Sequence, residues 1–154
     1  MGLYKKASAY KPAKRKTLAE KTTRELEKVL DRVFSEFIRL RDADDNGWVR
    51  CITCGNAHIW NSGKMHCGHY INRDVKATRY NEINNNGQCE SCNSFHSGKI
   101  HLYRWRLVQK YSEEEVENLE HIARLGGSYD RCWLQQKIIE YREKVRLLKR
   151  EKGL

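Results

Sequence analysis

The chain has 154 residues, of which 39% are hydrophobic and 32% are charged. This length suits one domain with an ordinary core, and without an apolar run of about 18 residues we expect no membrane span. The first residues lack the apolar segment of a secretory signal, so we expect a soluble, cytoplasmic protein. The formal net charge of +10 favours a nucleic acid as partner over an anionic lipid surface or a merely solubilising charge.

The basic excess is confined to the first two thirds of the chain. Residues 1–50 carry 13 Lys and Arg against 8 acidic residues, residues 51–110 carry 8 against 3, and residues 111–154 carry 9 against 9. We expect a flexible basic arm at 1–16, an N-terminal helix within 17–47, a core at 48–110 and a C-terminal helical region at 111–154.

Capping signals and apolar stripes predict amphipathic helices on both sides of that core. Thr22 and Glu25 form a capping box, and turn-forming residues end the first helix at 42–47. Its apolar stripe comprises Leu26, Val29, Leu30, Val33, Phe34, Phe37 and Ile38. Further helices are expected at about 98–110, after a cap at Ser112, and after a cap at Ser128.

The last of these helices also carries an apolar stripe, which comprises Leu134, Ile138, Tyr141, Val145 and Leu148. We interpret both stripes as core. As the alternative, one of them forms a homodimer interface.

Four of the six cysteines form two Cys-x-x-Cys pairs, Cys51 with Cys54 and Cys89 with Cys92. Two such pairs supply the four thiolates of a closed tetrahedral zinc site, which leaves no open position for catalysis. We therefore predict a structural zinc ion. Between the pairs we expect strands at 58–60 and 65–71, joined as a hairpin across 61–64.

Three polar residues stand at notable positions around the second cysteine pair. His69 lies near the end of the second expected strand, Asn84 precedes Cys89 by five residues, and Asn93 follows Cys92 directly. This pattern resembles the zinc-stapled HNH/HNN branch of the ββα-metal endonucleases, phage endonuclease VII among them. The fuller motifs, Cys67-Gly68-His69-Tyr70-Ile71, Thr78-Arg79-Tyr80-Asn81-Glu82 and Gln88-Cys89-x-x-Cys92-Asn93, are similar to the NinG/Rap family of lambdoid phage recombination endonucleases.

The resemblance covers about residues 51–93. It implies an α+β fold, with a zinc-stapled ββα-metal core flanked by amphipathic helices. It also implies a phage protein of the bacterial cytoplasm that cleaves branched DNA, D-loops and Holliday junctions, with Mg²⁺ or Mn²⁺ and no small-molecule cofactor.

The resemblance also implies a role for each of the three polar residues. His69 would be the general base, Asn84 would orient its imidazole through a side-chain hydrogen bond, and Asn93 would hold the divalent ion. Many of these enzymes carry an Asp directly before the base, where this chain has Gly68. His66, on the same strand face as residue 68, is a candidate to replace this Asp as a metal ligand. The other candidates are Asp74 and a set of water and DNA phosphates beside Asn93.

Basic residues cluster beside His69 and after the second cysteine pair, and they predict contacts with the DNA backbone. They are Arg73, Lys76, Arg79, Lys99, Arg104 and Arg106. Two other functions remain open: a zinc module that binds nucleic acid without cutting it, and a site-specific homing or restriction nuclease. The second is disfavoured because no separate recognition domain is evident.

Overall fold

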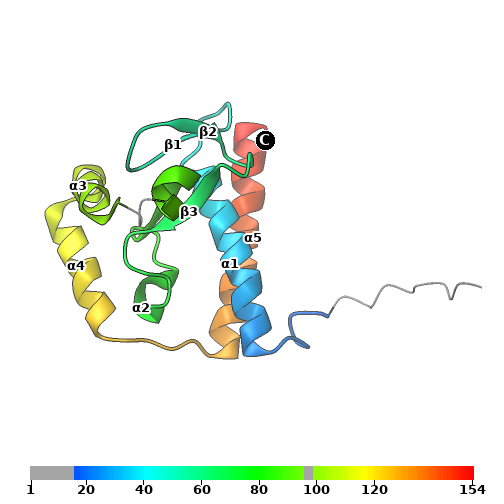
Figure 1. Ribbon diagram of the computed structural model, residues 1–154. Coiled ribbons are helices and arrows are strands. Elements are labelled where there is room, and N and C mark those ends of the chain that lie inside the picture. Colours follow the sequence, from blue (N-terminus) through cyan, green and yellow to red (C-terminus); the bar gives the residue numbers. More distant parts are fainter. Residues whose placement is uncertain (1–15, 96–98) are drawn as a thin grey trace, which may run out of the picture.

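The computed structural model describes residues 16–95 and 99–154, so all of the predicted basic arm except Lys16 lies outside the described residues. In chain order the elements are α1 (Thr23–Arg41), β1 (Trp48–Arg50), β2 (Ala57–Ile59), β3 (Met65–His69), α2 (Lys76–Arg79), β4 (Asn85–Cys89), the short π-helical segment η1 (Ser91–Phe95), α3 (Ile100–Lys110), α4 (Glu113–Arg124) and α5 (Arg131–Lys152) (Figure 1). The fold is therefore mixed α+β, with small sheets, as predicted.

Helix α1 begins at the predicted capping box. The Glu25 N–H donates to the Thr22 hydroxyl (3.2 Å), and the Thr22 N–H donates to the Glu25 carboxylate (2.7 Å). The helix ends at Arg41, where the predicted turn segment begins. The cap of α5 was predicted wrongly: Asp130, not Ser128, accepts a hydrogen bond from the Trp133 N–H (2.8 Å), because the helix starts only at Arg131.

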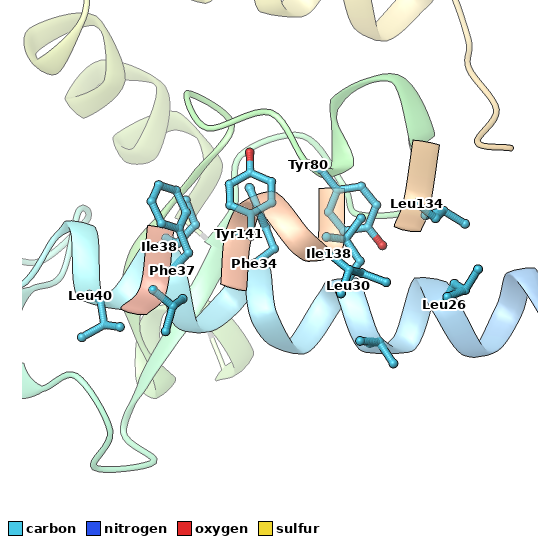
Figure 2. Packing of buried hydrophobic residues seen from close by; sticks show 12 residues of the cluster. Leu26, Leu30, Phe34, Phe37, Ile38, Leu40, Tyr80, Leu134, Ile138 and Tyr141 are labelled. Carbon is cyan, nitrogen blue, oxygen red and sulfur yellow. The ribbon is translucent and has the colours of Figure 1, made fainter. Parts of the chain in front are cut away.

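Helices α1 and α5 lie side by side, and their apolar stripes pack against each other (Figures 1 and 2). The Tyr141 ring of α5 sits 4.8 Å from the Phe34 ring and 5.0 Å from the Phe37 ring. The buried members of this core are Leu26, Val29, Leu30, Phe34, Phe37, Ile38, Leu40, Tyr80, Leu134, Ile138, Tyr141 and Val145. The interpretation of both stripes as core is confirmed, since each covers the other.

The strands form two antiparallel pairs, β1 with β2 and β3 with β4. The predicted hairpin between 58–60 and 65–71 is therefore wrong, although both strands exist. The reason lies in the cysteine pairs. The turn through Cys51 and Cys54 folds β2 back onto β1, and β4 must run beside β3 to carry Cys89 to that turn. A hydrogen bond from the Ile52 N–H to the Gly87 carbonyl (2.8 Å) joins the first turn to β4.

Helices α3 and α4 pack against each other on the far side of β3 and β4 from α1 (Figure 1). Tyr103 of α3 is fully buried, and its hydroxyl donates to the Gly68 carbonyl (2.9 Å), which anchors α3 to β3. Within the described parts of the chain, none of the helices is long and apolar enough to cross a bilayer.

Candidate functional site

The two cysteine pairs meet in one cluster, as predicted. The sulfur atoms of Cys51, Cys54, Cys89 and Cys92 all lie within 4.8 Å of one another, and Cys54 Sγ is 3.7 Å from Cys89 Sγ. Four sulfurs at about 2.3 Å from a tetrahedral zinc ion would lie about 3.8 Å apart. The cluster therefore fits a structural metal such as zinc, held by the turn after β1 and by the end of β4.

The surroundings of Cys51 favour the thiolate that a metal requires. Burial raises the pKa of the Cys51 thiol, but the backbone N–H of Cys54 (3.5 Å) and the Thr53 hydroxyl (3.1 Å) point at its sulfur. These donors outweigh burial and lower the pKa to about 6.

His69 ends β3 and faces Asn85 across the strand pair. It lies between two hollows. One, of 450 Å³, opens toward α1 and is lined by Asp31 and Arg39 among others; the second, of 600 Å³, is lined by Asn93 and Ile100. Arg73 lines both. The structure thus brings together three of the predicted site residues: His69, Arg73 and Asn93.

The surroundings of His69 favour the neutral imidazole. Burial lowers the pKa of His69 to about 4, and the positive charge of Arg73 acts in the same direction. A hydrogen bond with the backbone carbonyl of Arg79 opposes them only in part. A neutral imidazole keeps the lone pair of one ring nitrogen available to accept a proton at neutral pH.

The predicted hydrogen bond from Asn84 to His69 is absent from the described structure. Asn84 is fully buried, and its amide instead contacts the loop after β3: it accepts from the Ile71 N–H (2.7 Å) and donates to the carbonyls of Ile71 (3.1 Å) and Thr78 (3.0 Å). Both N–H groups of the Asn84 amide are used by these backbone carbonyls, so none is left to donate to the imidazole. Asn84 therefore fixes the loop rather than the ring.

The residue that sequence analysis missed here is Asn85. Its amide donates to the carbonyls of Arg79 (3.0 Å) and Asn81 (2.8 Å), so it fixes the chain segment that follows α2, opposite His69 in the strand pair. Three consecutive asparagines that run into a strand are a usable signal, because asparagine disfavours strands and a buried amide needs partners.

A second missed residue is Asp31 of α1. Arg79 binds it with two hydrogen bonds, Nε to Oδ1 at 3.0 Å and Nη2 to Oδ2 at 2.6 Å. The Tyr80 hydroxyl also donates to it, at 2.9 Å. Asp31 therefore fastens the segment whose carbonyl contacts His69 to the long helix.

The two candidate ligands for a divalent ion, His66 and Asn93, contact each other. His66 Nε2 lies 3.1 Å from the Gly63 carbonyl, which can only accept, so Nε2 carries the proton. Its Nδ1 then accepts from the Asn93 amide, at 3.2 Å. Both ring nitrogens of His66 are thus engaged within the protein, which leaves no lone pair for a metal in this arrangement.

Gly68 leaves no room for the carboxylate that related enzymes carry before the base. A Cβ atom at this position would lie 2.3 Å from Gln88 Oε1 and 2.6 Å from Gln88 Cβ, and the Gln88 side chain is fully buried. The space that an Asp side chain would need is therefore occupied by the Gln88 side chain of β4.

We expect Gly68→Ala to lower the free energy of unfolding by about 1–3 kcal/mol, because the new methyl group overpacks a closed strand pair. Chemical denaturation measures this. A Gly68→Ala/Gln88→Gly double variant should lose less stability than the two single variants lose together, because the second change removes the side chain that the new methyl group meets. A Gly68→Ala protein as stable as the wild type would contradict the proximity of Gln88.

Most of the predicted DNA contacts are already paired with carboxylates. Arg79 and, more loosely, Arg73 bind Asp31, Lys76 binds Glu27 (3.1 Å), and Arg104 binds Glu113 and Glu120 of α4 (2.7 and 2.9 Å). Only Lys99 and Arg106 of the six form no ion pair with a described residue. Four of the six positive charges are therefore partly offset by neighbouring carboxylates.

Fold and site together define a small α+β protein with a cluster of four cysteines that could hold a structural metal and, at the other end of the same strand pair, a half-buried histidine. A family profile described as "Bacteriophage Lambda NinG protein" matches residues 4–151. The chain belongs to the NinG family.

Proteins named ninG from three phages are similar to it over 85 residues, or 54% of this chain. The identity is 35% for Escherichia phage lambda, 34% for Escherichia phage 933W and 33% for Salmonella phage P22. The match spans 38%, 39% and 38% of those relatives, so the chain covers about two fifths of their length. No solved structure matches the chain significantly.

Proposed function

We propose that this protein is a structure-selective DNA endonuclease that cleaves branched recombination intermediates, such as D-loops and Holliday junctions, by metal-dependent phosphodiester hydrolysis. The observation that carries the proposal is the environment of His69. Burial keeps the pKa of the imidazole low, which favours the neutral ring at physiological pH, and the ring shares a hollow with Arg73 and Asn93. A neutral, oriented imidazole is what a general base for water requires.

The arrangement of elements supports the same proposal. Strands β3 and β4 are antiparallel and are followed by η1 and α3, which is the order of two strands and a helix expected of a ββα-metal site. The cysteine cluster ties the end of β4 to the turn after β1. The metal there would hold the strands and helix together rather than take part in hydrolysis.

Within this proposal each site residue has a task. His69 accepts the proton of the attacking water, and the partly exposed Arg73 binds the scissile phosphate. The Asn93 amide nitrogen donates to His66, so its oxygen is the atom that would hold Mg²⁺ or Mn²⁺ together with DNA phosphates. Such an ion, when bound, would polarise the phosphate and stabilise the leaving oxygen.

Few protein ligands are available for that ion. Among the described residues, the only cluster of three or more His, Cys, Asp or Glu side chains suited to a metal is the four-cysteine site. This observation favours a second candidate, a zinc module that binds nucleic acid without cutting it. The two candidates differ in whether phosphodiester bonds break.

The test uses the zinc-loaded chain with Mg²⁺, a labelled four-way junction, and unlabelled linear duplex of matched sequence as competitor. We expect nicks near the branch point, because a branch opens the stack and exposes deformable backbone that a protein without a base-reading helix can recognise. Linear duplex should compete at least about tenfold less well at equal nucleotide concentration. Equal competition would indicate a general nuclease, and binding without any cleavage in Mg²⁺ or Mn²⁺ would favour the zinc module.

A single site of this kind cuts one strand. Paired nicks across a junction would therefore need two copies of the chain or two successive binding events.

A further inference from the structure

A groove of 860 Å³ lies apart from the two hollows beside His69. Its walls come from β1 with the following cysteine turn and from α3, and they include Trp48, Arg50, Ile52, Arg106 and Lys110. None of its lining residues lines either hollow beside His69. The groove is therefore a separate feature, and the roles assigned to the candidate active site do not account for it.

The groove presents an aromatic face to solvent. Trp48 is 48% exposed, although it begins a strand in which the next residue, Val49, is fully buried. An indole that stays in water does not contribute the favourable free energy that burial of a large apolar side chain provides. An exposed indole at the edge of a groove is a surface on which a flat ligand stacks.

Two arginines line the groove beside this face. Arg50 and Arg106 form no ion pair with any described residue, in contrast to most of the cations near His69. The Arg106 guanidinium lies 4.7 Å from the ring centre of Trp105, which is itself 52% exposed. This cation–π contact holds the guanidinium at the groove without neutralising its charge.

Two acidic residues also line the groove, and they differ in their partners. Asp42 binds Arg41 and Lys110 and accepts from the Gly87 N–H (2.8 Å). Asp44 accepts from the N–H groups of Asn46 and Trp48, both at 2.9 Å. A ligand in the groove would therefore meet an indole face, two guanidinium groups that form no ion pair within the described parts of the chain, and the single negative charge of Asp44.

We propose that this groove binds a short single-stranded segment of nucleic acid, with a base stacked on Trp48 and neighbouring phosphates on Arg50 and Arg106. Stacking and unpaired positive charge are the two elements of single-strand binding. A duplex suits the groove less well, because each base in a duplex already has both faces covered by its neighbours. Under the proposed function, such a segment is the unpaired strand that leaves a D-loop.

The test measures binding alone, so its outcome does not depend on whether the protein cuts DNA. The zinc-loaded full chain, without Mg²⁺, is titrated into fluorescein-labelled oligothymidylate and into a blunt duplex of the same length, and anisotropy is recorded. We expect Trp48→Ala to weaken single-strand affinity roughly tenfold and to leave duplex affinity within about twofold. Trp48→Phe should recover part of the loss, since the ring keeps a stacking face.

The charges are tested separately with an Arg50→Ala/Arg106→Ala double variant. It should weaken single-strand binding and reduce the dependence of log affinity on log salt by a slope of about 1–2. The matched control is Arg24→Ala/Lys28→Ala, which removes the same charge from the exposed face of α1 at a distance from the groove. Zinc content and circular dichroism verify that each variant is folded.

Single-strand affinities of the Trp48→Ala and double-arginine variants equal to that of the wild type would overturn the proposal. An equal loss in the α1 control would overturn it as well, because binding would then follow net charge alone.

Discussion

Replacing His69 by alanine is expected to abolish cutting while junction binding persists. The cutting rate should fall by roughly a hundredfold or more, because the attacking water loses its general base. Junction affinity should change by less than about threefold, because affinity comes from many phosphate contacts and His69 acts on one water. Single-turnover cleavage and anisotropy on the same four-way junction measure the two effects.

The matched control is His101→Ala. His101 is exposed on α3 and lines neither hollow beside His69, so its removal should leave cutting intact. An equal loss of binding and cutting in the His69→Ala protein would mean that the residue is structural.

The pH profile provides a second readout of the same base. Because burial lowers the pKa of His69 to about 4, the imidazole remains neutral as pH falls past the 6.5 of a free histidine. Cutting should therefore persist at pH 5 and decline only near pH 4, with zinc content measured alongside. A decline centred near pH 6.5 would contradict the environment described for His69.

Removing one metal ligand is expected to have the largest effect on stability. In a Cys89→Ser protein the cluster retains three sulfurs, and the end of β4 is no longer tied to the turn after β1. Structural zinc contributes on the order of 10 kcal/mol in small domains, which exceeds what the short strands can supply themselves. We expect loss of zinc together with loss of the folded strand pairs.

Elemental analysis and thermal unfolding check this expectation. Cys132→Ser is the control, because Cys132 is exposed on α5 and lies outside the cluster. It should keep the zinc content and the melting temperature of the wild type. A wild-type protein without zinc, or a Cys89→Ser protein that melts as the wild type does, would refute a structural metal at this site.

The sequence by itself determined the features that depend on neighbouring residues. The capping box of Thr22 and Glu25 places the start of α1, because both of its hydrogen bonds are made within one helical turn. Helical spacing identifies the two stripes that pack as α1 and α5. The two Cys-x-x-Cys pairs predict that their four sulfur atoms lie together, since a metal site needs four ligands and each pair supplies two.

Only the tertiary structure decided which strands pair and which buried polar groups meet. Strand β2 pairs with β1 across the short turn through Cys51 and Cys54, and β3 pairs with β4, which follows only after the loop and helix α2 between them. Asn84 forms hydrogen bonds with a loop instead of with His69. Asp31 binds Arg79, from which it is 48 residues distant in the sequence. A buried amide or carboxylate must find hydrogen-bond partners, and those partners are whatever groups the packed elements bring within about 3 Å of it.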